Sequence, residues 1–210
     1  MRVSPVIACL LVACSSLPAV ALDMDAAFAQ SRLQRVHDVS LQAVADSPKA
    51  TVVRAAFARV RGSLDAELSV GVLVVGGPIV AEALTDHIVA ANESLADLPE
   101  GERAFVLAHE LGHVVQSHWS KRALLFREHH PDETATGQAD LAADRLVAEA
   151  SVLAHRQELD ADAFALHIVR RLGYDFETAL AVFERQGAQP DTATHPGSLR
   201  RIAHLRSLAS

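Results

Sequence analysis

Hydrophobic positions recur at the helical period along most of the chain, most clearly over residues 104–116. This stretch reads AFVLAHELGHVVQ and contains no break before its polar end. It is apolar almost all round, as is typical of a helix buried on every side. The polar side chains of His109, Glu110 and His113 therefore need partners inside the protein.

Other segments share this helical period, and two short apolar runs do not. The further predicted helices are 25–45, 118–127, 139–172, 176–185 and 198–208. Residues 51–61 fit a helix or a strand equally well, whereas VGVLVV at 70–75 and HIVAA at 87–91 predict strands. Polar loops are expected at 131–138 and 187–194. The pattern predicts a mainly helical α+β domain with a small sheet before the helix at 104–116.

Composition narrows the possible chemistry. The 210 residues are 50% hydrophobic and 21% charged, which fits one globular domain. The net charge of −7, with no basic cluster longer than Arg200-Arg201, argues against a nucleic-acid partner. The two cysteines, Cys9 and Cys14, both lie near the N-terminus, so a metal bound elsewhere must use histidine and carboxylate ligands.

Residues 1–21 are predicted to be a signal peptide, followed by a mature domain at 22–210. Two cleavage sites compete: Leu11-Val12-Ala13-Cys14 resembles a bacterial lipobox, and Ala19-Val20-Ala21 is a site for signal peptidase I. We favour the lipobox, which would make Cys14 a lipidated first residue. Because Ser15 follows, resemblance to sorted lipoproteins implies a periplasmic protein anchored to the outer membrane. Either site predicts export.

The spacing of His109 and His113 suggests a metal site. Residues four apart lie about 40° apart around a helix and about 6 Å along it, so both imidazoles can bind one zinc ion. Glu110 is then free to take a proton from zinc-bound water, as in the His-Glu-x-x-His motif. The alternative is a pair of core histidines that bind backbone carbonyls, and the motif alone does not separate the two.

A third ligand is expected from residues 158–162, ELDAD. Glu158 and Asp162 share one helix face, so one can bind zinc while the other supports a ligand. The alternative is a solvated acidic face. His155, one turn earlier, is a competing ligand, although we favour a surface or supporting role. Other nearby histidines are predicted to be solvated: His118, His129 and His130.

HELGH, ELDAD and Thr194-His195-Pro196 with Arg201-Ile202, in this order, resemble the M48 family of zinc metallopeptidases over residues 70–205. The resemblance implies one zinc ion bound by His109, His113 and Glu158, with Asp162 supporting a ligand. It also implies that Glu110 is the catalytic base, that His195 lies near the metal, and that Arg201 faces the site.

The stretch before the metal helix departs from the family pattern. Members usually carry an Asn-Ala pair there, whereas residues 80–84 read VAEAL and contain no Asn. Contacts from that Asn to the substrate backbone are therefore not expected. We expect the substrate to add as a strand along residues 87–91.

These features predict a zinc metalloendopeptidase that cleaves misfolded or unstructured proteins of the bacterial cell envelope, with a role in protein quality control. His195 or Arg201 would stabilise the oxyanion. His195 follows a polar loop, which would let its imidazole both block and assist the open zinc position. The alternative is a non-enzymatic, zinc-stabilised binding or chaperone-like protein. A structural zinc site would leave Glu110 without a chemical role and would need His195 as a permanent fourth ligand.

Overall fold

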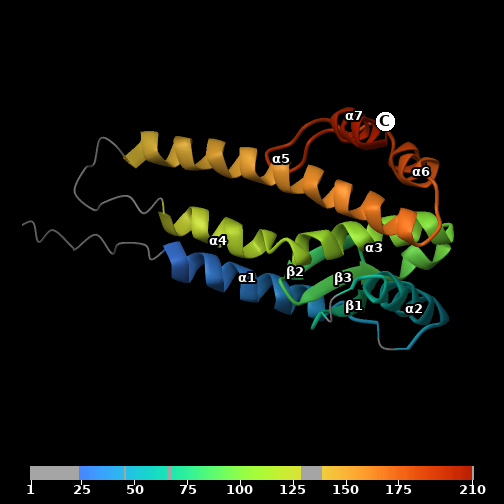
Figure 1. The fold of residues 1–210 in the computed structure, drawn as a ribbon. Helices are drawn as coiled ribbons and strands as arrows, with labels where there is room; N and C mark the ends of the chain where they lie inside the picture. Colours follow the sequence, from blue (N-terminus) through green and yellow to red (C-terminus); the bar gives the residue numbers. More distant parts are fainter. Residues whose placement is uncertain (1–23, 45, 66–67, 129–138, 210) are drawn as a thin grey trace, which may run out of the picture.

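The computed structural model describes residues 24–44, 46–65, 68–128 and 139–209. The predicted signal peptide and the loop predicted at 131–138 lie outside these ranges. Figure 1 shows the elements in chain order: α1 (Met24–Ser40), α2 (Pro48–Gly62), β1 (Gly71–Val75), β2 (Ala81–Thr85), β3 (Ile88–Asn92), the 3₁₀ helix η1 (Glu93–Asp97), α3 (Glu100–Val115), α4 (His118–Glu128), α5 (Ala139–Arg171), α6 (Phe176–Gln186) and α7 (Ser198–Ala209). The predicted mainly helical α+β class is confirmed.

The three strands form one sheet in the order β1-β3-β2. β3 is central: it pairs parallel to β1 and antiparallel to β2. The strands predicted at 70–75 and 87–91 are confirmed, whereas β2 was not predicted. Its sequence AEALT carries little β-branched character, and its pairing with β3 supplies what local preference does not.

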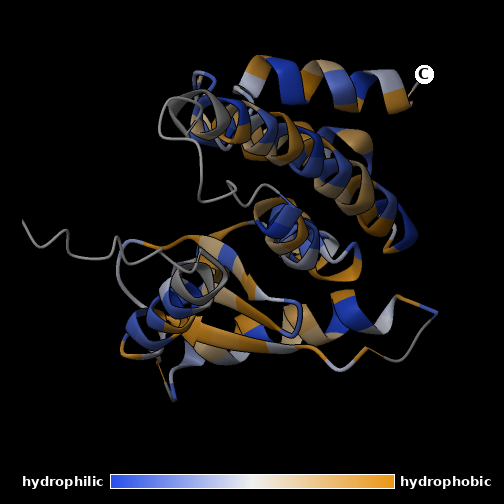
Figure 2. Cartoon of the chain, turned by 90° about the vertical axis from the view of Figure 1, so that its left-hand side faces the viewer, coloured by the Kyte–Doolittle hydropathy of each residue, from blue (hydrophilic) through white to orange (hydrophobic). Residues whose placement is uncertain are grey.

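Alternate strand residues face two different cores. Val74 and Val89 belong to the main core, which α2, α3, α5 and α6 close over one face of the sheet. Val75 and Ala90 face the opposite side and pack against Val39 of α1. The strands are coloured mostly hydrophobic in Figure 2, as expected for a sheet covered on both faces.

Two helix boundaries differ from expectation for local reasons. α1 ends at Ser40 rather than near residue 45, because the chain then pairs with β1: Val44 N–H donates to the Val74 carbonyl at 2.9 Å. The ambiguous segment at 51–61 is helical. Ser47 caps α2 by accepting from Ala50 N–H, and Pro48 occupies the first turn, where its missing N–H costs nothing.

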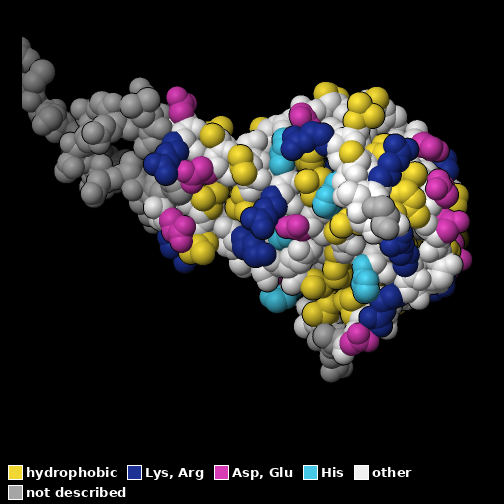
Figure 3. Space-filling model, turned by 45° about the horizontal axis from the view of Figure 1, so that its top comes forward, with side chains coloured by type: hydrophobic (Ala, Val, Ile, Leu, Met, Phe, Trp, Pro, Cys, Tyr) yellow, Lys and Arg dark blue, Asp and Glu magenta, His cyan; other side chains and the backbone are white. Residues whose placement is uncertain are grey.

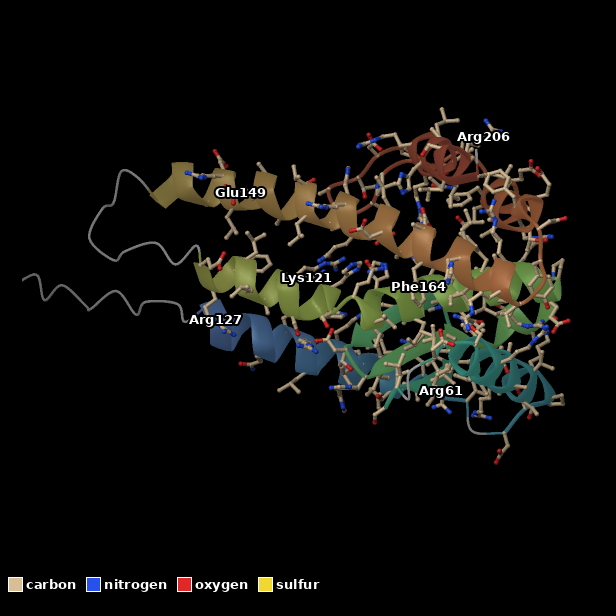
Figure 4. All side chains as sticks on the ribbon, viewed as in Figure 1. Arg61, Lys121, Arg127, Glu149, Phe164 and Arg206 are labelled. Carbon is tan, nitrogen blue, oxygen red and sulfur yellow. The ribbon has the colours of Figure 1, made fainter. Side chains whose placement is uncertain are left out.

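Gly112 lets α3 and α5 pack closely, and these two helices carry the candidate site. A Cβ atom at this position would lie 3.3 Å from Ala161 Cα and 3.1 Å from the ring of Phe164 (Figure 4). Glycine weakens a helix interior by about 0.5–1 kcal/mol relative to alanine, so close packing is the reason for its use here.

Within the described residues, none of the helices offers a stretch apolar and long enough to cross a bilayer.

Candidate metal centre

Three predicted side chains converge where α3 faces α5. His109 and His113 of α3 and Glu158 of α5 are buried, and each offers a ligand atom within 4.8 Å of the others. The two Nε2 atoms lie 3.2 Å apart; that of His109 lies 3.3 Å from Glu158 Oε2, and that of His113 lies 3.3 Å from the other oxygen, Oε1. A tetrahedral zinc ion with bonds of about 2.0–2.2 Å separates its ligand atoms by about 3.3–3.6 Å. The two nitrogens and the Glu158 carboxylate are therefore spaced as three ligands of such a site require.

The electrostatics of the centre favour a cation. Burial by itself would raise the pKa of Glu158, but hydrogen bonds from His109 and His113 hold it well below its usual range. Burial would likewise lower the pKa of His109, but Asp162 and Glu158 raise it to about 10. Glu158 Oε2 is nevertheless buried without a hydrogen-bond partner. Acceptor atoms that face one another in this way attract either protons or a metal ion, which compete for the same lone pairs.

His109 is held by a charged pair. Its Nδ1 lies 3.0 Å from Asp162 Oδ1, which assigns the Nδ1 proton to this hydrogen bond. Nε2 then faces the centre, where it carries either a proton shared with Glu158 or a lone pair for a metal. Arg201 donates to both oxygens of Asp162, at 2.6 and 2.7 Å. Burial would raise the pKa of Asp162, but Arg201 and His109 hold it below its usual value.

His113 is held by a neutral partner, His118. Their Nδ1 atoms lie 2.8 Å apart. A His113 that binds a metal through Nε2 carries its proton on Nδ1, so His113 donates and His118 accepts. The prediction that His118 is solvated is wrong, because its side chain is only 1% exposed. Burial, with His113 next in importance, lowers the pKa of His118 to about 3. No helical period reveals this contact, since Ser117 at φ 52° breaks the helix and turns the chain between the two histidines.

Glu110 lies beside the centre but outside the ligand group. Its Oε2 accepts a hydrogen bond of 2.7 Å from Ala83 N–H of β2, and the side chain is half-buried. Ala83 is one of the residues that sequence reasoning missed, because β2 was not predicted. The contact places Glu110 between the metal ligands and a strand edge.

His195 reaches the centre from the loop before α7. Its side chain is 59% exposed, and its Nε2 lies 3.6 Å from Glu158 Oε1. The loop is held internally by a hydrogen bond of 2.8 Å from Thr192 N–H to the His195 carbonyl. It is also held to α5, because His155 Nε2 donates to the Thr192 carbonyl at 2.6 Å. His155 therefore lies outside the ligand group and supports the loop.

Comparison with known families identifies the chain. The model of peptidase family M48 matches residues 80–209, more than half of the sequence. The chain belongs to peptidase family M48. No curated protein and no solved structure gives a match. Membership makes the chain a peptidase of a metallopeptidase family, with proteins or peptides as substrates, and confirms the resemblance carried by HELGH, ELDAD and Thr194-His195-Pro196.

Two clefts flank the ligands of this M48 domain. We call the larger one, of about 260 Å³, the α4 cleft; besides the ligands its walls include Ala83, His118, Trp119 and Arg122. We call the other one, of about 140 Å³, the α6 cleft; its walls include the apolar residues Phe105, Val106, Val182 and Phe183. Glu110 and His195 line both clefts. The two clefts share the polar residues around the ligands and differ in their outer walls, which carry Arg122 and His118 in the α4 cleft and mainly apolar side chains in the α6 cleft.

The strand available to a substrate is β2. Strand addition along 87–91 is wrong, because β3 is central and already paired on both edges. Asn92 N–H donates to the Val80 carbonyl, so the alternation of an antiparallel pair turns the peptide groups of Ala81 and Ala83 away from β3. The N–H of Ala83 donates to Glu110, and its carbonyl accepts from the indole N–H of Trp119. Strand order is set by tertiary packing, which the apolar pattern of a single strand does not encode.

Proposed function

We propose that this M48 chain is a zinc-dependent endopeptidase. The observation that carries the proposal is the position of Glu110, half-buried beside three converging ligand atoms yet outside them. Three protein ligands are typical of catalytic zinc, and the fourth position is then left for substrate or water. Glu110 lines both clefts, where a peptide bond would be held.

The side chains have separable roles in this proposal. His109, His113 and Glu158 would hold zinc, which supplies Lewis-acid chemistry that polarises the scissile carbonyl and acidifies water. Glu110 takes the proton of the attacking water and delivers it to the leaving amine. Its bond to Ala83 N–H keeps the carboxylate at the strand edge, where that amine would lie.

The oxyanion role falls to His195 rather than Arg201. His195 is exposed at the mouth of both clefts, whereas Arg201 already uses Nε and one amino group on Asp162. We assign Arg201 a positioning role, through Asp162, on His109. His195 lies 3.6 Å from Glu158, so a small shift of its loop would bring the imidazole to the open position and block it. The same side chain would thus restrain the resting enzyme.

The substrate would add antiparallel to β2 through the outward-facing peptide groups of Ala81. β2 runs from the α6 cleft, lined by Val80, to the α4 cleft, lined by Ala83. An antiparallel peptide places residues N-terminal to the scissile bond at the α4 cleft and those following it at the α6 cleft. Proteins that are misfolded or unstructured can supply such an extended segment.

A metal-stabilised binding protein without catalysis is the alternative function. Zinc content and casein cleavage of the wild type and Glu110→Gln separate the two. The peptidase proposal expects about one zinc ion per chain in both proteins and loss of cleavage only in the variant. Full zinc with no wild-type cleavage under any condition would favour the binding protein.

We further propose that the peptidase acts in the bacterial cell envelope, on proteins under quality control, from a lipid anchor on Cys14. The support is the N-terminal sequence, in which Leu11-Val12-Ala13-Cys14 resembles a lipobox. Cys14→Ser should abolish lipid attachment. Mass spectrometry of the mature N-terminus is the measurement, and a mature chain that begins at Leu22 would identify the signal peptidase I site instead.

A further inference from the structure

Arg122 is a partly buried cation without an acidic partner. Several other arginines pair with an acid, as Arg35 does with Glu82 and Arg185 with Glu102. Arg103 instead donates an amino group to backbone carbonyls. On the face shown in Figure 3, basic and acidic side chains are likewise interspersed. No carboxylate of the described residues lies within 4.0 Å of Arg122, although burial lowers its pKa. Glu158 and Glu110 favour its charge only from a distance, and an arginine that has lost water without a carboxylate in direct contact can accept an anionic ligand.

The guanidinium is oriented with its amino groups unused. Arg122 Nε donates to Gln157 Oε1 at 2.5 Å, and Gln157 Nε2 donates to the His118 carbonyl at 3.1 Å. The centre of the guanidinium lies 5.9 Å from the centroid of the Trp119 ring. No described residue accepts from the two terminal amino groups, which form the fork that recognises a carboxylate.

A second donor without a partner belongs to the same cleft. His118 Nδ1 accepts from His113, so its proton lies on Nε2, which is buried and has no hydrogen-bond partner. A buried donor left unpaired is destabilising and is rare in native proteins. Arg122 and His118 both line the α4 cleft. The cleft is also lined by the carboxylates of Glu82, Glu110 and Glu158, so an anion would bind at the end formed by the donors of Arg122 and His118.

We propose that the α4 cleft is a specificity subsite for an acidic side chain of the substrate, on the N-terminal side of the scissile bond, with Arg122 as the residue that selects it. This inference rests on the proposed endopeptidase function. A glutamate or aspartate side chain would form an ion pair with the Arg122 guanidinium, whereas a glutamine side chain could not. The position relative to the scissile bond follows from antiparallel addition to β2.

The test compares isosteric peptides within one enzyme. A neutral peptide cleaved by the wild type is identified from casein fragments, and Glu, Gln or Lys is placed at each of the three residues before the scissile bond. We expect kcat/KM for Glu to exceed that for Gln about tenfold or more at one position, as for a charge-assisted hydrogen bond. Arg122→Gln should reduce this ratio to about one, and Arg122→Glu should favour Lys. A ratio of substrates does not depend on how much of a variant folds.

Lys121→Gln is the matched control. Lys121 is the preceding residue of α4 (Figure 4), it is exposed, and it does not line the cleft, so the loss of its charge should leave the Glu to Gln ratio intact. Equal cleavage of Glu and Gln peptides by the wild type, or a ratio unchanged in Arg122→Gln, would overturn the subsite. Failure to cleave any peptide is a failure of the proposed function. The same peptides can then be bound to Glu110→Gln, where equal affinities for Glu and Gln would overturn the subsite separately.

Discussion

The two histidines of α3 offer equivalent nitrogens to the metal centre but are fixed by different chemistry. His109 is hydrogen-bonded to Asp162, which pairs with Arg201; the two residues lie 53 and 92 positions away in sequence. His113 is hydrogen-bonded to the neutral ring of His118, five residues away. A carboxylate draws the Nδ1 proton strongly, while an imidazole does so weakly. One ligand is therefore fixed by long-range electrostatics and the other by a local turn.

The clefts follow the same division. Beyond the ligands that both clefts share, the α6 cleft has apolar walls and an arginine, Arg201, paired with Asp162. The α4 cleft has His118 Nε2 and the amino groups of Arg122, which have no hydrogen-bond partner among the described residues. The difference teaches that the arginine beside His109 is used to hold a ligand, whereas the arginine beside His118 has amino groups left for a substrate. Variants on the two sides should therefore fail in different ways.

The largest effect is expected from Asp162→Ala, which leaves Arg201 buried without its counter-charge. Breaking a buried pair costs roughly 3–5 kcal/mol of unfolding free energy, and losing the support of a ligand costs about 10–100-fold in zinc affinity. Urea denaturation and chelator competition measure the two. Asp160→Ala, on the same helix and half-buried, is the control. Stability and affinity close to wild type would show that the charged pair does not fix His109.

Gly112→Ala should affect both histidine ligands, lowering the stability of the fold and the affinity for zinc together. The added Cβ meets Ala161 Cα at 3.3 Å and the Phe164 ring, so α3 and α5 must separate. Overpacking of this kind costs about 1–3 kcal/mol, and the shift should also weaken zinc binding because it moves Glu158 from both histidines. Gly62→Ala is the control, since nothing lies within 4 Å of a Cβ there. Weakened stability with unchanged zinc affinity would contradict the coupling.

His118→Leu should weaken zinc binding about tenfold with little loss of stability. The variant removes the acceptor of the His113 Nδ1 proton, but it also removes the unpaired Nε2 donor, and the second change offsets part of the first in the unfolding free energy. Chelator competition and urea denaturation are again the measurements. A loss of stability as large as that of Asp162→Ala would remove the distinction between the two sides.

The smallest effect is expected from His195→Ala, a change of a few-fold in rate on two substrates. If His195 restrains the enzyme, an unstructured substrate should be cleaved faster, because the open position is no longer blocked. If it acts only on the oxyanion, cleavage of both unstructured and folded substrates should slow. Initial rates on casein and on a folded protein decide between these, and unchanged rates on both would leave His195 a packing role.

Much of the fold followed from periodicity, and the failures have local causes. The long helix α5 and the helix α3 were predicted closely, because apolar residues repeat along many turns. β2 was missed, since the short alanine-rich AEALT carries no strand preference of its own. The residues of the candidate centre were also named from sequence, because i, i+4 spacing places two side chains on one helix face. Glu158, 45 residues beyond His113, was a candidate ligand from the spacing within ELDAD, and the family resemblance implied the same residue.

The sequence by itself determined which residues can bind a metal and take a proton, since that depends on side-chain chemistry and helical spacing. It also determined the family, through three motifs in order. Only the tertiary structure decided that β2 is the open edge, that His118 lies buried against His113, and that no described carboxylate contacts Arg122 directly. These facts depend on contacts between segments far apart in the chain, or across the turn at Ser117, and no local pattern records them.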